Sequence, residues 1–243
     1  MGPDAPHLSP EVVRALLVQL QPARDAIVLI GGQALNLWAE RYASEAIELA
    51  REAPFTSKDI DFYGTAEAVE RCARLLGGTH ELFGVHDRSE AAGVVTTPEG
   101  IAIDLVRTPR GVHPDELTQR AVPLLSTRVM HPIHVLVSRA ANVVHLSRTD
   151  ATSLKQLRAA IVVVREFTRE ALRQLGPRAA HRLNAWAFEV AKSDDGLAVW
   201  HQHGVDLFPA ILLDAALGEA FVAKRYPQML RALEDARASA RAL

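Results

Sequence analysis

An apolar run, a glycine pair and two spaced aspartates follow one another in residues 27–63, which read IVLIGGQALNLWAERYASEAIELAREAPFTSKDIDFY. Residues 27–30 are apolar and rich in β-branched side chains, which predicts a short buried strand bounded by the glycines. Gly31 and Gly32 let the backbone turn sharply and let a ligand approach without a Cβ in the way. We therefore expect a ligand to be able to reach the backbone at the end of the first strand.

The glycine pair leads into a predicted helix that runs from residue 33 to about residue 49. Its apolar residues recur at spacings of three and four: Leu35, Trp38, Ala39 and Tyr42. This spacing is typical of a helix that buries one face. Because the N-terminus of a helix attracts anions, the segment favours a phosphate at the glycines.

The segment after this helix supplies the opposite charge. If it forms a strand, Asp59, Asp61 and Tyr63 share one face while Ile60 and Phe62 face the core. Two strand positions span roughly 7 Å, so both carboxylates can hold one divalent cation or a pair of cations. Repulsion between bare carboxylates favours a metal, and two acids on an exposed strand face are the alternative.

A β-hairpin is predicted further along the chain. Two β-rich runs flank a Pro-Glu-Gly turn: residues 94–97 and residues 101–106. In the second run Asp104 lies among apolar residues, where an acid is costly without a partner or a metal. Arg107 and Arg110 follow in a basic loop. If Asp104 faces a site, these two arginines are near enough to contact a triphosphate, and a solvated loop is the alternative.

Helices are expected in most of the rest of the chain. One opens at Ser9-Pro10-Glu11, and another lies between Thr65 and the Gly77-Gly78 stop. After His131 the whole sequence has helical character, with starts at His131-Pro132, at a Thr152 cap and at Pro177. We therefore expect a boundary near residues 120–130, which divides a domain at 1–125 from an α-helical domain at 126–243.

Composition and missing motifs narrow the classes of protein. The chain has 243 residues, 49% of them hydrophobic, and a net charge of -2, which is ordinary for a globular protein. The lone cysteine, Cys72, excludes an internal disulfide and favours a cytoplasmic location. No run approaches the roughly 18 apolar residues that a membrane span needs, so we expect a soluble protein. The chain has no P-loop and no serine-hydrolase elbow, and its histidine pairs, His131 with His134 and His201 with His203, lack a third ligand at zinc spacing.

The glycine pair and the aspartates resemble the nucleotidyltransferase superfamily of DNA polymerase β-like folds. The shared features are an apolar strand that ends in Gly31-Gly32, a helix, and Asp59-Ile60-Asp61 in an apolar strand. Residues 31–35 and 57–62 are most similar to the AbiEii-type toxin branch. The similarity covers residues 27–107 well and the rest loosely. In the superfamily the glycines and aspartates are usually nearer in sequence, so the segment between them is enlarged here.

The resemblance implies an α+β fold, in which a small mixed sheet with flanking helices forms the nucleotidyltransferase domain and an α-helical domain follows. It implies three catalytic, metal-binding carboxylates: Asp59, Asp61 and Asp104 on a neighbouring strand. It also implies a set of nucleotide-binding residues: Gly31, Gly32, Lys58, Arg107, Arg139 and Lys155. Arg139 stands where lysine is common and Lys155 precedes Gln156 where an aspartate is usual, so the alternative for both is a helix-surface cation.

The activity that the resemblance implies is transfer of a nucleoside monophosphate from an NTP to an acceptor hydroxyl, with Mg²⁺ or Mn²⁺ as the cofactor. For a toxin-like enzyme the acceptor is RNA, such as a tRNA end, or a protein, and an antitoxin-like protein is a partner. One alternative is a small-molecule acceptor of the antibiotic type. The other is a module that binds nucleotides or another protein and has lost catalysis.

Overall fold

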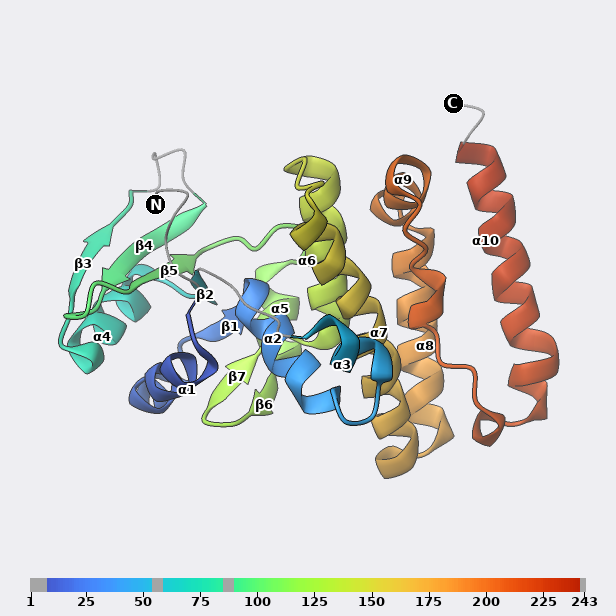
Figure 1. The fold of residues 1–243 in the computed structure, drawn as a ribbon, viewed down its shortest axis with the longest axis horizontal. Helices are drawn as coiled ribbons and strands as arrows, with labels where there is room; N and C mark the ends of the chain where they lie inside the picture. Colours follow the sequence, from blue (N-terminus) through green and yellow to red (C-terminus); the bar gives the residue numbers. More distant parts are fainter. Residues whose placement is uncertain (1–7, 54–58, 85–89, 241–243) are drawn as a thin grey trace. The chain divides into compact units, whose positions relative to one another are not determined.

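The computed structural model describes residues 8–53, 59–84 and 90–240 (Figure 1). The chain divides into two compact units, one comprising Met1–Leu37 with Pro54–Ser138 and the other Trp38–Ala53 with Arg139–Leu243. These bounds differ from the expected division at residue 125. The first unit extends to Ser138, and residues 38–53 belong to the second unit. The assignment of catalysis to the first unit is a prediction.

Seven strands form one mixed sheet in the first unit, in the order β3-β4-β5-β2-β1-β7-β6 (Figure 1). The strands are Val28–Ile30 (β1), Ile60–Tyr63 (β2), Thr79–Leu82 (β3), Ala91–Thr96 (β4), Ala102–Val106 (β5), Val122–Leu124 (β6) and Thr127–Val129 (β7). β2 is parallel to β5 and β1 is parallel to β7, whereas the other neighbours are antiparallel. The expectation of a mixed sheet with flanking helices is confirmed at this level.

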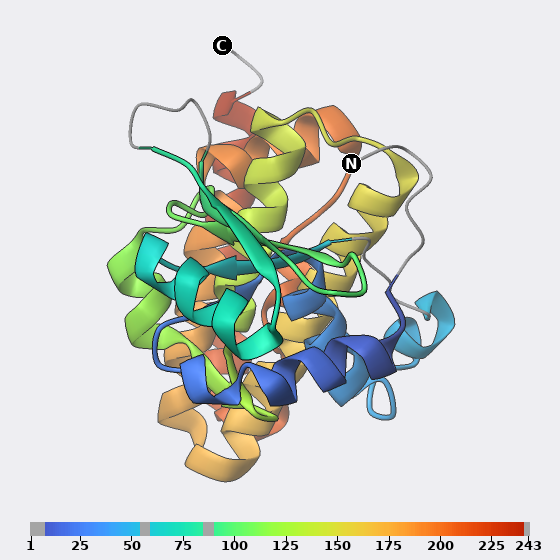
Figure 2. The ribbon, with the colours of Figure 1, turned by 90° about the vertical axis from the view of Figure 1, so that its left-hand side faces the viewer.

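One face of the central strands is buried. At alternate positions of β2 and β5, four side chains point to this buried face: Ile60, Phe62, Ile103 and Leu105. Helix α4 (Ala66–Leu76) lies against β3 and β4 (Figure 2), with Val69 and Cys72 among its buried residues. It starts after the Thr65 cap and ends at Gly77, as predicted. The unit also contains α1 (Pro10–Gln19), the 3₁₀ turn η1 (Gln21–Ala23) and α5 (Pro114–Arg120).

Two parts of the sheet do not follow from the local sequence. The predicted boundary region near residues 120–130 contains a hairpin of β6 and β7, and β7 pairs with β1 through Leu29 and Val129. β3 is exposed along its whole length and has no alternating pattern. Each is stabilised as a strand by pairing with another strand of the sheet, β7 with β1 and β3 with β4.

The helix after the glycines is shorter than predicted. α2 (Gly31–Tyr42) begins at the first glycine, and its predicted face (Leu35, Trp38, Ala39 and Tyr42) is buried. Residues 43–45 form turns, and Ala46 takes an extended backbone that interrupts the helix before α3 (Ile47–Glu52). One predicted helix over 33–49 is therefore two helices.

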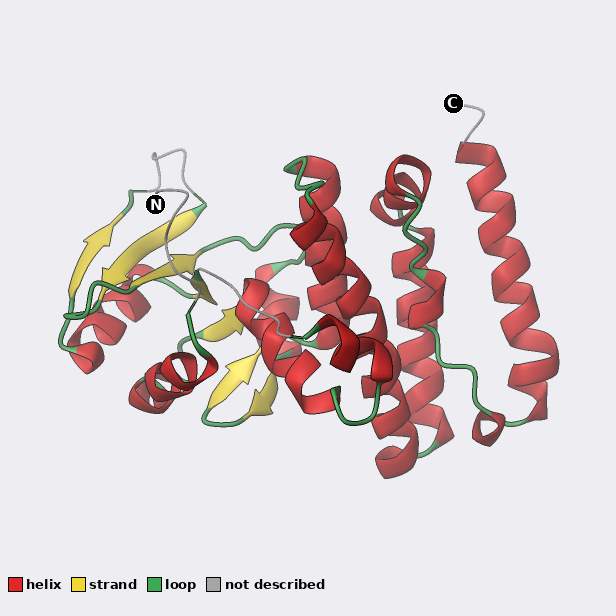
Figure 3. Cartoon of the chain, viewed as in Figure 1, coloured by secondary structure: helices red, strands yellow, loops and turns green. Residues whose placement is uncertain are grey.

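Helices are the only regular secondary structure among the described residues of the second unit, and loops connect them (Figure 3). It contains the end of α6 (Pro132–His145), then α7 (Ala151–Leu175), α8 (Pro177–Lys192), α9 (Asp194–His203), the 3₁₀ turns η2 (Phe208–Ala210) and η3 (Ala215–Leu217), the π-helix η4 (Phe221–Arg225) and α10 (Tyr226–Ala240). The predicted cap of α7 is wrong. Asp150 caps it, and its Oδ1 accepts a hydrogen bond from the Ser153 N–H at 3.0 Å. None of the described helices has the length and apolar composition to cross a membrane.

Residues 38–53, the larger part of the enlarged segment between the glycines and the aspartates, belong to the helical unit. Trp38 packs edge-on against Phe167 of α7, with ring centroids 5.6 Å apart. The Tyr42 hydroxyl donates to the Glu170 carboxylate at 2.5 Å. Four ion pairs also join this segment to α7: Arg41–Glu170 at 2.5 Å, Glu45–Arg173 at 2.7 Å, Glu48–Arg165 at 2.8 Å and Glu52–Lys155 at 3.7 Å. The extra length therefore supplies two short helices to the face of α7.

A pair of buried histidines in the first unit makes its stability depend on pH. Burial lowers the pKa of His131 to about 3 and that of His134 to about 4, and the nearby Arg120 acts in the same direction. Glu116, whose Oε2 lies 3.9 Å from His134 Nε2, opposes this shift in part. The His131 Nδ1 accepts from the Ile133 N–H at 3.1 Å, so this ring caps α6 in its neutral form.

We predict that stability falls as the pH is lowered from about 7.5 to about 5.5. The unfolded chain binds protons at both histidines below an ordinary pKa of about 6.5 and the folded chain does not, so the free energy of unfolding decreases in this window by roughly 1 kcal/mol per histidine. Urea unfolding at the two pH values measures the loss. His134→Gln should reduce it by about half, whereas His80→Gln, which replaces an exposed ring of the same unit, should leave it unchanged. An equal loss in wild type and His134→Gln would refute the assignment.

Candidate active site

Asp61 and Asp104 lie opposite each other on the two central parallel strands. They are register partners between β2 and β5, and each is half-buried. Directly opposed residues of neighbouring strands point to the same side of a sheet. Both carboxylates therefore lie on the face opposite to the buried face of Ile60 and Phe62. The predicted alternation is confirmed, and the acids from two distant segments share one face.

Gly31 lies directly against the Asp61 carboxylate. Ile30, at the end of β1, is the register partner of Asp61, and Gly31 follows it with φ +68°. A Cβ at Gly31 would lie 2.3 Å from Asp61 Oδ2, which is far inside van der Waals contact. The first residue of α2 therefore has to be glycine for two reasons, its left-handed backbone and the carboxylate beside it. The glycine and the aspartate form one structural feature.

Asp59 adds a third negative charge to this group. It is half-buried and immediately precedes β2, at the sheet edge where β1 ends and α2 begins. The pKa of Asp104 is raised, mainly by burial and also by the charge of Asp59. A bound cation would offset both effects, because it compensates the lost hydration and the repulsion between the carboxylates.

These carboxylates fit a hard cation that completes its coordination with oxygens of a bound substrate. Among the residues that the structure describes, no three His, Cys, Asp or Glu side chains converge into a complete metal-binding group. Mg²⁺ usually takes one or two carboxylates and completes its octahedral shell with water and substrate phosphates. Asp61 and Asp104, with Asp59 nearby, match that mode better than an all-protein cage.

We predict that Gly31→Ala is more destabilising than Gly77→Ala. Both glycines have a left-handed backbone, with φ +68° and φ +63°, but a Cβ at Gly77 meets nothing within 4 Å. Gly77→Ala should therefore cost only the backbone strain, about 1 kcal/mol, whereas Gly31→Ala adds about 1–2 kcal/mol because the Asp61 carboxylate must move. Urea unfolding of both variants measures the difference. Equal losses would show that the Asp61 side chain does not lie against Gly31.

The two arginines after β5 form interactions with other residues of the first unit. Arg107 donates to the backbone carbonyls of Phe83 and of Gly84, the latter at 3.1 Å. Arg110 forms an ion pair with Glu90. Arg107 therefore fixes the backbone directly after β3. A role in contacting a triphosphate remains a prediction for both arginines.

Of the remaining predicted nucleotide ligands, two lie in the second unit, one lies outside the described residues and one lies in the first unit. Arg139 donates to Gln156 Oε1 at 3.0 Å, and Lys155 pairs with Glu52. Both are in the second unit, and a role for them beside the aspartates of the first unit stays a prediction. Lys58 lies outside the described residues. Gly32, the second residue of α2, is buried directly after Gly31.

The cysteine behaves as a core residue. Cys72 is buried in α4, and burial raises the pKa of its thiol to about 11. A thiol with so high a pKa carries almost no thiolate at neutral pH, so it is a poor nucleophile. The site consists of carboxylates and glycine backbone.

Comparison with known proteins adds no family to this description. No protein-family model matches the chain, and no similar sequence was found among curated proteins. The resemblance to nucleotidyltransferases therefore rests on the residues already described.

Proposed function

We propose that the chain is a metal-dependent nucleotidyltransferase that moves a nucleoside monophosphate from an NTP to an acceptor hydroxyl. The observation that carries this proposal is the register pairing of Asp61 with Asp104 on the central strands, with Gly31 against the Asp61 carboxylate. This arrangement places glycine backbone, which a ligand can approach closely, beside a cluster of carboxylates. The sequence resemblance to the superfamily supports the same activity.

In this proposal Asp61 and Asp104, with Asp59 nearby, would hold Mg²⁺ or Mn²⁺, and the triphosphate would complete its coordination. The metal supplies neutralisation of the charge on the phosphates and on the departing pyrophosphate. Asp61 and Asp104 hold its position because their strands are central in the sheet and paired in register. The glycine backbone at the start of α2 lets the phosphates approach, where the helix N-terminus favours an anion.

For the acceptor, we propose RNA or a protein, as for a toxin-like transferase, and an antitoxin-like protein as a partner. The support is the similarity of residues 31–35 and 57–62 to the AbiEii-type branch. Aromatic residues make up 5% of the chain, so base stacking is not an extensive source of RNA affinity. An acceptor recognised through its backbone or through a folded end is therefore favoured over an extended single strand.

The test is incubation of the chain with each labelled NTP and Mg²⁺, in separate reactions with total RNA, with a protein extract and with aminoglycosides. We expect label to appear in RNA or protein, and to disappear with EDTA. Label in the aminoglycosides alone would reassign the acceptor to a small molecule. NTP binding by equilibrium dialysis without label in any acceptor class would favour a nucleotide-binding module, and the absence of both binding and transfer would refute the proposal.

A further inference from the structure

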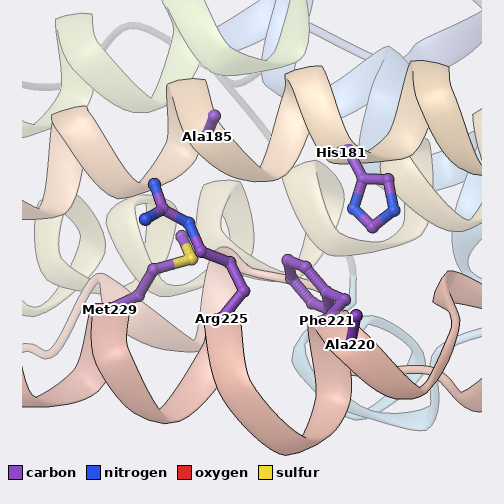
Figure 4. A pocket seen from close by; sticks show the side chains of 6 residues that line it. All are labelled: His181, Ala185, Ala220, Phe221, Arg225 and Met229. Atoms are coloured by element: carbon purple, nitrogen blue, oxygen red, sulfur yellow. The ribbon is translucent and has the colours of Figure 1, made fainter.

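The second unit contains an open pocket between α8 and the start of α10. Its volume is about 370 Å³, within the range of small-molecule sites. Six residues line it: His181, Ala185, Ala220, Phe221, Arg225 and Met229 (Figure 4). All of them belong to the second unit, so the site is complete within that unit.

The pocket has an apolar floor and a polar rim. Phe221 and Met229 are 7% and 2% exposed, so they present buried apolar surface at the bottom. The half-buried ring of His181 lies beside Phe221, with centroids 4.9 Å apart at an angle of 50°. Ala185 and Ala220, which are exposed, leave the entrance wide. An apolar group of a ligand can therefore enter and displace water from the floor.

Arg225 places a positive charge at this apolar surface. Its side chain reaches across the pocket toward Ala185 of α8 (Figure 4). In the part of the chain that the structure describes, no acid lies within ion-pair distance of its guanidinium. Arg237 of α10 differs because it pairs with Asp206. A guanidinium with five donors and no acidic partner is a ready ligand for a carboxylate, sulfonate or phosphate.

The backbone at the pocket has an unusual form. Residues Phe221–Arg225 form a π-helix, in which the Tyr226 N–H donates to the Phe221 carbonyl five residues earlier. π-Helical turns are rare and occur frequently at functional sites. This turn carries both the floor residue Phe221 and the cation Arg225.

We propose that this pocket binds a small organic anion, with an apolar body on Phe221 and Met229 and one anionic group on Arg225. The floor requires an apolar body and excludes a bare inorganic ion as the preferred ligand. The single guanidinium fits one anionic group. The inference does not rest on nucleotide transfer, because none of the residues in the proposed active site takes part.

The test uses the fluorescent probe anilinonaphthalene sulfonate, which combines an aromatic body with one sulfonate, and its neutral counterpart N-phenylnaphthylamine. We expect wild type to bind both. Arg225→Gln should weaken sulfonate binding about ten- to hundredfold, as expected for loss of a charge-assisted hydrogen bond, and leave the neutral probe unchanged. Ala185→Phe, which fills the entrance from an exposed position, should weaken both probes.

The matched control is Arg231→Gln, which removes an exposed arginine of α10 that does not line the pocket. It should leave both affinities unchanged. Circular dichroism verifies that each variant is folded. The proposal is overturned if wild type binds neither probe, if Arg225→Gln and Ala185→Phe bind the sulfonate as wild type does, or if Arg231→Gln weakens it as much as Arg225→Gln.

Discussion

Asp61→Asn is expected to lower nucleotide transfer by about a thousandfold, because a metal held by carboxylates contributes several kcal/mol of stabilisation to developing charge and about 1.4 kcal/mol corresponds to a factor of ten. Asparagine keeps the size of the side chain beside Gly31 but removes the charge. The fold should persist, since the change relieves repulsion within a group in which the charge of Asp59 already raises the pKa of Asp104. Label incorporation per unit time, at saturating NTP and Mg²⁺, measures the loss.

Asp25→Asn is the matched control for this prediction. It makes the same chemical change in the same unit, at a side chain that is 87% exposed. Transfer by this variant should equal that of wild type. If Asp61→Asn retains transfer within a factor of about ten, the carboxylate does not hold the metal and the assigned site is wrong.

Trp38→Ala is expected to destabilise the second unit by about 3–5 kcal/mol, the usual loss for a buried tryptophan. Trp38 is 1% exposed, stacks with Tyr42 at a centroid distance of 6.2 Å and meets Phe167 edge-on. The cavity would open between residues 38–53 and α7, where the ion pairs of Glu45 and Glu48 are too exposed to compensate. Urea unfolding followed by far-ultraviolet circular dichroism measures the change.

The control for this prediction lies in the same segment. Ile47 is 62% exposed, so Ile47→Ala removes an apolar side chain without a cavity and should change stability by no more than about 0.5 kcal/mol. Similar losses in Trp38→Ala and Ile47→Ala would contradict the attachment of residues 38–53 to α7. Loss confined to Trp38→Ala would establish why the chain carries this additional length.

The sequence was sufficient wherever a rule acts over a few residues. The alternation that places Asp61 opposite in direction to Ile60 and Phe62 is a property of any strand with that pattern, and it is confirmed. The buried face of α2, the hairpin around Gly100 and the stop of α4 at Gly77 follow from equally local causes. Each can be predicted because periodicity and turn chemistry depend on neighbouring residues alone.

Only the tertiary structure determined what depends on segments that are distant in sequence. It set Asp104 in register with Asp61 and brought Gly31 against that carboxylate, which gives the candidate site its shape. It also assigned residues 38–53 to the helical unit and brought Arg225 of one helix to Ala185 of another. Strand pairing and helix packing join surfaces whose local sequences are compatible with many partners. The chain alone therefore specifies the faces, and the folded core selects which faces meet.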